Sequence, residues 1–154
     1  MTKVRHKILF FSALSIFANA MPLNKEFRAT WVITWEYISS SQNAEQTMAR
    51  IDEIMDNHAT ANMNAVLFQV RQSGTAYYNS SYEPWGYYAG YEHPGIDPLQ
   101  YAIDAAHNRG LELHAWFNVF QASSIHEGAP AQAHPEWVCR DRDGDPMTSS
   151  RSLS

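Results

Sequence analysis

Cysteine is almost absent from this sequence, which has only Cys139 among its 154 residues. A lone cysteine cannot form a disulfide within the chain, so the fold has to be held together by burial of apolar side chains. We expect Cys139 itself to be a small buried side chain.

Basic residues are also scarce, because 11 Lys and Arg stand against 16 Asp and Glu and give a formal net charge of −5. Three of the cations, Lys3, Arg5 and Lys7, lie within the first twenty residues. A chain beginning near Met21 would therefore carry 8 − 16, or about −8. Binding to a phosphate backbone needs clustered positive charge, so we expect no nucleic-acid partner.

The apolar run at residues 8–17 is too short to span a bilayer, which takes about 20 residues. It follows the three cations and precedes Ala18-Asn19-Ala20, an order typical of a secretory signal peptide. We expect residues 1–20 to be a signal peptide and the protein to be secreted, periplasmic or extracellular, with no membrane anchor after cleavage. The alternative is a retained anchor or a buried N-terminal helix.

Motifs for metals and cofactors are missing as well. The seven histidines form no His-Glu-x-x-His motif, and there are no paired cysteines. Asp141, Asp143 and Asp145 are spaced like calcium ligands, but Pro146 takes the position where a calcium loop requires glycine. No phosphate-binding glycine motif follows the first two expected strands. We expect neither a metal nor a cofactor.

The sequence does contain alternating strand and helix patterns. Apolar, β-branched runs predict strands at residues 27–35, 64–71 and 111–119. Helical periodicity between them predicts one helix ending near residues 57–62 and a second in the segment before the third strand. The residues expected to cap or end these helices are Asn43 with Gln46, Asn62, Asp97 with Pro98 and Gln100, and Gly110.

This order of strand, helix, strand, helix, strand predicts an α/β fold with right-handed parallel crossovers. Both a barrel and a doubly wound sheet fit the order. Residues 121–154 show only loop signals. A (β/α)8 barrel takes about 250 residues. If the fold is a barrel, residues 21–154 are its N-terminal part, about three β/α units, and the barrel is incomplete in this chain.

Side chains alternate along the expected strands, and in a barrel the polar set faces the interior. Four of these inward residues lie near or at the carboxyl ends, where barrel enzymes bind substrate: Gln69, Arg71, Trp116 and Asn118. Buried amide and guanidinium groups are costly when unpaired. We therefore expect them to be satisfied either by one another or by a polar ligand.

Aromatic residues crowd the segments that follow the first two strands: Trp35, Tyr77, Tyr78, Tyr82, Trp85, Tyr87, Tyr88 and Tyr91. Flat rings with hydrogen-bonding tips suit the apolar faces and hydroxyl edges of sugars. The alternative is a long loop that packs on itself as a lid.

The sequence resembles the opening of the glycosyl-hydrolase-like family 10 domain in three stretches, FRATWVITW, NAVLFQVRQSGTAYYNSSYEPWG and PGIDPLQYAIDAAHNRGLELHAWFNVF. With His134-Pro135-Glu136-Trp137, the resemblance covers about residues 26–137. It implies a (β/α)8 barrel acting on a polysaccharide, with bacterial cell-wall glycan among the substrates. The chain departs from the family at Gln72, where proline is common, and at Val119-Phe120-Gln121, where the family often has Pro-aromatic-Arg.

The resemblance and the strand pattern together predict seven substrate-binding residues: Gln69, Arg71, Trp116, Asn118, Trp35, Tyr78 and Trp85. A glycosidase also needs two carboxyl groups beside the scissile bond. The resemblance implies that these acids follow later strands, beyond residue 154, so Glu36 and Glu83 are not assigned as catalytic. This chain alone is then expected to be inactive. The alternatives are a non-catalytic carbohydrate-binding scaffold and an inactive, truncated gene product.

Overall fold

The computed structural model describes residues 26–147, so the expected signal peptide at residues 1–20 lies outside the described residues. The elements, in chain order, are β1 (Ala29–Val32), α1 (Thr34–Tyr37), α2 (Ala44–Thr60), β2 (Ala65–Gln72), β3 (Thr75–Ala76), η1 (Tyr87–Ala89), α3 (Pro98–His107), β4 (Glu112–Phe117), α4 (Pro130–Ala133) and η2 (Pro135–Trp137). Within the described residues no helix combines the length and apolar character needed to cross a membrane.

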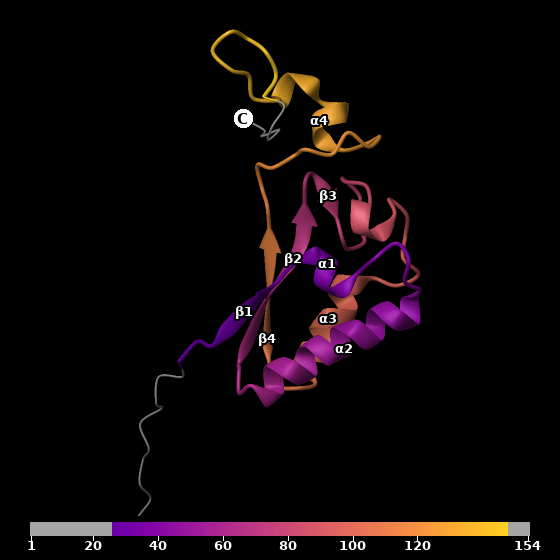
Figure 1. Ribbon diagram of the computed structural model, residues 1–154, viewed down its shortest axis with the longest axis vertical. Helices are drawn as coiled ribbons and strands as arrows, with labels where there is room; N and C mark the ends of the chain where they lie inside the picture. The colour runs from indigo at the N-terminus through magenta and orange to yellow at the C-terminus, as the bar shows by residue number, and fades with distance from the viewer. Residues whose placement is uncertain (1–25, 148–154) are drawn as a thin grey trace, which may run out of the picture.

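The sheet has β2 at its centre, with β1 and β4 parallel to it on either side (Figure 1). Trp31 of β1, Leu67 of β2 and His114 of β4 lie in register and so share one face. The short β3 runs antiparallel to the carboxyl end of β2. Two β-to-α crossovers therefore bring three carboxyl ends to one edge, as the strand and helix pattern predicted.

The first strand is shorter than the predicted range 27–35, and Trp35 lies in a helix instead. The backbone N–H of Thr34 donates to the side-chain Oε1 of Gln69 at 3.1 Å, in place of a partner in the sheet. The chain then turns, and the N–H of Ile38 donates to the carbonyl of Thr34 at 3.2 Å. A long-range contact with β2 thus ends the strand before its β-branched sequence does.

Helix caps follow the sequence closely at three of four points. Asn43 Oδ1 accepts from Gln46 N at 2.9 Å while Gln46 Oε1 accepts from Asn43 N at 3.0 Å, a reciprocal capping box. Asp97 Oδ1 accepts from the N–H of Gln100 at 3.1 Å, but the Gln100 side chain does not reach back to the cap. It donates to Asp104, one turn further on, at 3.2 Å.

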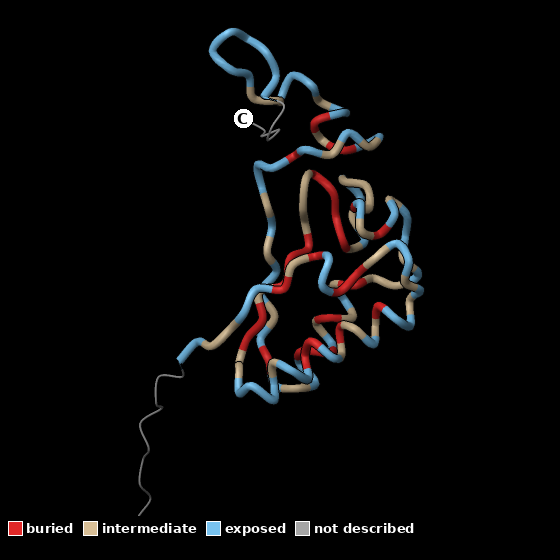
Figure 2. The backbone as a smooth tube through the Cα atoms, in the orientation of Figure 1, coloured by how far each residue is buried: buried red, intermediate tan, exposed pale blue. Residues whose placement is uncertain are grey.

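Left-handed residues close both long helices as expected, with φ of 56° at Asn62 and 70° at Gly110. Helices α2 and α3 cover one face of the sheet. The buried residues lie along the strands and on the sides of the helices that face them (Figure 2). Phe68 is fully buried on this face, where its ring stacks on that of Tyr37 with centroids 4.2 Å apart.

Arg109, which follows α3, fastens that helix to α2. Its guanidinium lies 2.6 Å from Asp56 and 3.0 Å from Asp52, and the Tyr101 hydroxyl donates to Asp52 at 2.6 Å. The hydrogen bond from Arg109 holds the pKa of Asp56 below its ordinary value. These polar ties fix the helix layer against which the sheet packs.

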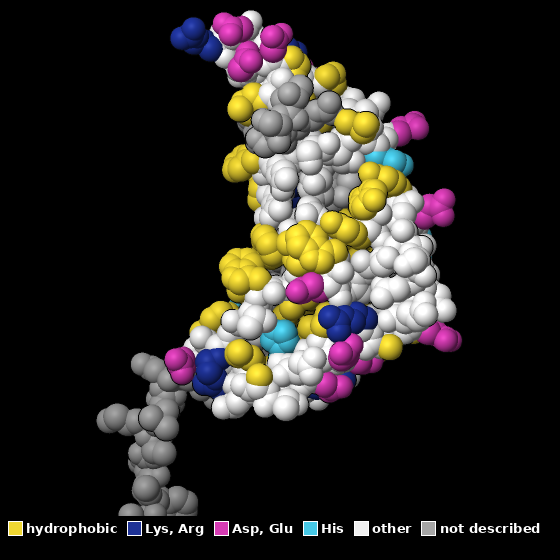
Figure 3. Space-filling model, viewed as in Figure 1, with side chains coloured by type: hydrophobic (Ala, Val, Ile, Leu, Met, Phe, Trp, Pro, Cys, Tyr) yellow, Lys and Arg dark blue, Asp and Glu magenta, His cyan; other side chains and the backbone are white. Residues whose placement is uncertain are grey.

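The opposite face of the sheet carries no helix among the described residues. Trp31 is 61% exposed there, and Glu112 and His114 are exposed too. Hydrophobic side chains gather along this concave side of the molecule (Figure 3). In a closed barrel this is the face that lines the interior.

Candidate functional site

The candidate site lies at the carboxyl ends of β1, β2 and β4 and in the loops that follow them, at the end of the sheet where β3 lies (Figure 1). A bulge in β2 shapes this edge. Gln69 pairs with Trp116, but Arg71 pairs with the very next residue, Phe117, so Val70 is the extra residue. Bulges commonly redirect side chains beside functional sites.

Arg71 is the most heavily bonded of the predicted site residues. Its Nε and Nη2 donate to the Glu83 carboxylate at 2.5–2.9 Å, and both side chains are nearly buried, at 11% and 13% exposed. Its Nη1 donates to the backbone carbonyls of Asn118 and Val119. Arg71 thereby ties the loop after β2 to the end of β4, and protein groups, rather than a ligand, satisfy its charge.

Gln69 is fully buried at the same edge. Its Oε1 accepts from the N–H and the hydroxyl of Thr34, at 3.1 and 3.3 Å, and the Tyr37 hydroxyl donates to its backbone carbonyl at 2.7 Å. Its Nε2 has no hydrogen-bond partner within residues 26–147. One buried donor of the site is therefore unsatisfied by the described part of the chain.

Trp116 and Asn118 lie at the carboxyl end of β4, beside Gln69 and Arg71. The Trp116 ring meets that of Trp31 edge to face, with centroids 4.7 Å apart, so an aromatic pair spans the open sheet face. Asn118 Nδ2 donates to Gln121 Oε1 at 3.1 Å. Gln121 stands where the resemblance leads one to expect arginine, and here it positions the asparagine amide.

The three aromatic site residues of the loops differ in exposure. Trp35 is half exposed and its ring lies 5.8 Å from that of Tyr88. Tyr78 and Trp85 are partly buried against the core cluster. The long loop therefore packs partly on itself, as in the lid alternative, and of these three residues Trp35 presents the most open ring.

Tyr77 anchors that packing. It is 1% exposed, its hydroxyl accepts from the N–H of Tyr88 at 3.4 Å, and burial raises its pKa to about 12. A Cβ on Gly86 would lie 2.2 Å from the Tyr77 ring. Gly86 therefore serves close packing rather than an unusual backbone angle, since its φ is −80°.

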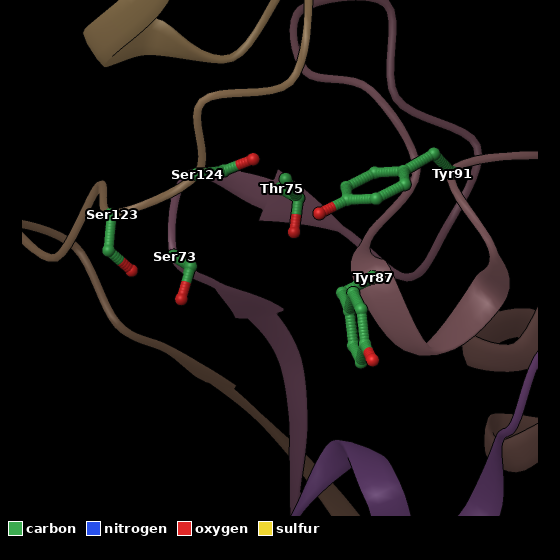
Figure 4. A pocket seen from close by; sticks show the side chains of 6 residues that line it. All are labelled: Ser73, Thr75, Tyr87, Tyr91, Ser123 and Ser124. Atoms are coloured by element: carbon green, nitrogen blue, oxygen red, sulfur yellow. The ribbon is translucent and has the colours of Figure 1, made fainter.

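Two hollows open among these loops. One, of about 170 Å³, is lined by hydroxyl-bearing side chains from three segments: Ser73, Thr75, Tyr87, Tyr91, Ser123 and Ser124 (Figure 4). The other, of about 300 Å³, is lined by Tyr82, Glu83, Gly128, Pro130, Ala133, His134 and Trp137. Sequence reasoning did not identify the first hollow. Its signals were the Ser73-Gly74 turn and the Ser123-Ser124 pair.

The groups available to a ligand at this edge are uncharged hydrogen-bonding side chains and aromatic rings. Within residues 26–147 no group of three or more His, Cys, Asp or Glu side chains could hold a metal ion. Glu83 is engaged by Arg71, and Glu36 accepts a hydrogen bond from Ile33 N at 3.3 Å in its own first helical turn. Neither is placed as one of a pair of free carboxyl groups.

Comparison with known proteins relates the chain to glycosyl hydrolases. The family model described as glycosyl hydrolase-like 10 matches residues 26–152. Glycosyl hydrolase YngK of Bacillus subtilis (strain 168) is 35% identical over 84% of this chain. Glycosyl hydrolase DigH of Escherichia coli (strain K12) is 36% identical over 69% of it. The chain spans 28% and 27% of the lengths of these two relatives.

Two solved structures share the fold at low sequence identity. An α-amylase from Lactobacillus plantarum superposes with a TM-score of 0.54 at 13% identity, covering 83% of this chain and 32% of its own. The maltogenic α-amylase AmyB from Thermotoga neapolitana gives 0.51 at 12% identity, covering 82% and 30%. These neighbours are TIM barrels, which confirms the predicted fold class as the N-terminal part of a (β/α)8 barrel.

Proposed function

The chain belongs to the glycosyl hydrolase-like 10 family, and on that premise we propose that the whole protein is a glycoside hydrolase acting on a polysaccharide. One observation of the structure carries the proposal. Two neighbouring parallel strands, β2 and β4, bring Gln69, Arg71, Trp116 and Asn118 to a single edge, the edge at which barrel enzymes bind substrate.

Within this proposal the described residues supply the sugar-binding side of the barrel mouth. The rings of Trp116 and Trp35 offer apolar surface to a pyranose. Gln69 is fully buried and positions Thr34 and Tyr37 through hydrogen bonds. Tyr78 and Trp85 support the loop that carries them. Arg71 acts as a positioning residue, since Glu83 and two carbonyls occupy its guanidinium.

We assign the two carboxyl groups that cleave the bond to later strands of the complete barrel. Glycoside hydrolysis needs such a pair about 5–9.5 Å apart, and Glu36 and Glu83 are both committed to hydrogen bonds nearby. We also propose that the protein is exported and meets bacterial cell-wall glycan, because residues 1–20 have the signal-peptide pattern.

The test uses a complete barrel in which residues 26–147 replace the matching part of the Bacillus relative. We expect reducing ends to be released from purified cell-wall glycan or another polysaccharide. Gln69→Ala should lower kcat/KM by roughly tenfold, because the hydrogen bonds that position Thr34 at the mouth are lost. Thermal melting of both proteins verifies folding. If a folded barrel cleaves none of the polysaccharides, the hydrolase proposal is wrong, and binding without cleavage would favour a carbohydrate-binding scaffold.

A further inference from the structure

We propose that the hydroxyl-lined hollow at the rim of the site is a subsite for one neutral pyranose unit of the polysaccharide. The inference rests on the proposed function and adds to it the chemical class of sugar bound beside the mouth. The hollow is built by the tip of the β2–β3 hairpin, the η1 region and the chain after β4 (Figure 4).

Close backbone packing forms this hollow. The N–H of Ser124 donates to the carbonyl of Ser73 at 3.0 Å. A Cβ on Gly74 would lie 3.1–3.3 Å from atoms of Ala122 and Pro130, so the hairpin tip touches the chain after β4. Gly74 also has a φ of 78°, which a glycine adopts without strain. The walls are therefore fixed before any ligand arrives.

Several hydroxyl groups face the hollow with hydrogen-bonding capacity left over. Those of Ser73, Ser123 and Tyr91 have no hydrogen-bond partner among residues 26–147. The Thr75 hydroxyl is already engaged, since it donates to the carbonyl of Gln72 at 2.8 Å and has a side-chain hydrogen bond with Tyr77, and Thr75 forms the buried floor of the hollow. Figure 4 shows the oxygens of Ser73, Thr75 and Tyr91 turned toward a common space. Such a set can both donate to and accept from sugar hydroxyls.

Tyr91 is held in an unusual conformation that keeps its ring over the hollow. Its φ is 62°, in the left-handed region that bulky residues rarely occupy. Its ring stacks on His126 at 4.1 Å and meets the ring of Tyr87 edge to face at 6.1 Å. Strain of this kind persists when surrounding structure fixes it, and it concentrates at ligand sites. The two tyrosine rings give a sugar ring flat walls.

The lining decides the charge of the ligand. The six lining side chains are serine, threonine and tyrosine, with no lysine, arginine or histidine among them, so a carboxylate or phosphate would enter without a countercharge. The volume of about 170 Å³ equals that of about six water molecules, which is room for one sugar ring and not two. A neutral hexose or N-acetylhexosamine unit fits both limits.

The experiment measures binding to the purified 154-residue chain by calorimetry and by chemical-shift mapping. The probes are the tetramers of N-acetylglucosamine and of maltose-type glucose, with tetragalacturonate as the acidic counterpart. Tyr91→Phe removes one hydroxyl and keeps the ring, and Ser73→Ala with Ser123→Ala removes two more. Tyr82→Phe is the matched control, since Tyr82 is 92% exposed and lies outside the hollow.

We expect a neutral tetramer to bind, with shifts centred on Thr75 and Ser124. Each lost hydroxyl should weaken binding about fivefold, and Tyr82→Phe should leave it unchanged. The inference is overturned if no neutral probe binds, if the triple variant binds like the parent, or if tetragalacturonate binds as tightly. Hydrolysis by the complete barrel is scored separately, so loss of this subsite and loss of the hydrolase proposal are distinguishable.

Discussion

Replacing Gly86 by alanine tests the packing that holds the aromatic loop together. The new Cβ would lie 2.2, 2.4 and 2.6 Å from Cζ, Oη and Cε2 of Tyr77, whereas carbon atoms pack at about 3.5–4 Å. Three backbone hydrogen bonds hold Gly86 in place, so its backbone cannot easily shift to relieve this clash. Gly86 N donates to Ala76 O at 3.0 Å, and Gly86 O accepts from Ala89 and Tyr91 at 3.0 and 3.1 Å. The buried tyrosine ring has to move by roughly 1 Å or more.

Two opposing effects set the magnitude. Overpacking of this kind costs about 1–3 kcal/mol. Because Gly86 has a φ of −80°, an alanine with room for its methyl group would instead stabilise the fold by about 0.4–1 kcal/mol through the unfolded chain. The cost of overpacking exceeds the gain from the less flexible unfolded chain, so we expect the free energy of unfolding to fall by about 2 kcal/mol.

Urea denaturation followed by circular dichroism measures this change. With a slope of about 1–2 kcal/mol/M, a loss of 2 kcal/mol lowers the midpoint by about 1–2 M. The matched control is Gly86→Ala in a Tyr77→Leu background, where the smaller side chain should shrink the cost of the alanine. An unchanged or higher midpoint for Gly86→Ala alone would refute the steric argument.

Three further perturbations have definite outcomes. Arg71→Met leaves the Glu83 carboxylate nearly buried without its partner, so the free energy of unfolding should fall by roughly 3 kcal/mol in urea titrations; a loss below 1 kcal/mol contradicts the clamp. Arg109 lowers the pKa of Asp56, so the stability that this carboxylate contributes is present above about pH 4 and is lost as pH falls through the lowered pKa. Asp56→Asn should therefore make the free energy of unfolding depend less steeply on pH between about pH 5 and 3. An unchanged pH dependence argues against the ion pair. Burial raises the pKa of Tyr77 to about 12, so the stability it contributes is complete below about pH 10 and is lost as pH rises toward 12. Burial raises the pKa of Tyr37 as well, so ultraviolet titration should show both phenols ionising after the exposed ones, and Tyr77→Phe should reduce the amplitude of this late change by one phenol.

Short-range features of the fold could be read from the chain. The Asn43 and Gln46 box, the Asp97 cap and the left-handed Gly110 depend on residues within about one helical turn, and all three occur in the structure. Where the local rule failed, a competing partner was present. Gln100 donates to Asp104 rather than to its cap, and Thr34 leaves the first strand to bond with Gln69.

The sequence predicts that the candidate site lies at the carboxyl ends of the strands, but it does not predict the contacts that form the site. Alternation along two strands predicts that Gln69, Arg71 and Trp116 lie near one edge. The structure places all three at the carboxyl ends of β2 and β4, but the register shifts between Gln69 and Arg71. Alternation could not show that Val70 is an extra residue, nor which group would satisfy the arginine. Those outcomes depend on cross-strand register and on loop conformation.

The sequence by itself therefore determined the order of the three parallel strands and the two long helices, the capping residues Asn43, Asp97 and Gly110, and the family, since each rests on residues near one another in the chain or on motifs of fixed order. The short elements α1, β3, η1, α4 and η2 were not predicted. Only the tertiary structure decided which side chains contact one another at the site. Glu83 reaches Arg71 across 12 residues, and Ser123 and Ser124 come beside Ser73 and Thr75 from a loop some fifty residues further along. Such contacts exist only after the sheet brings its carboxyl ends together, because no local preference encodes the distance between two loops.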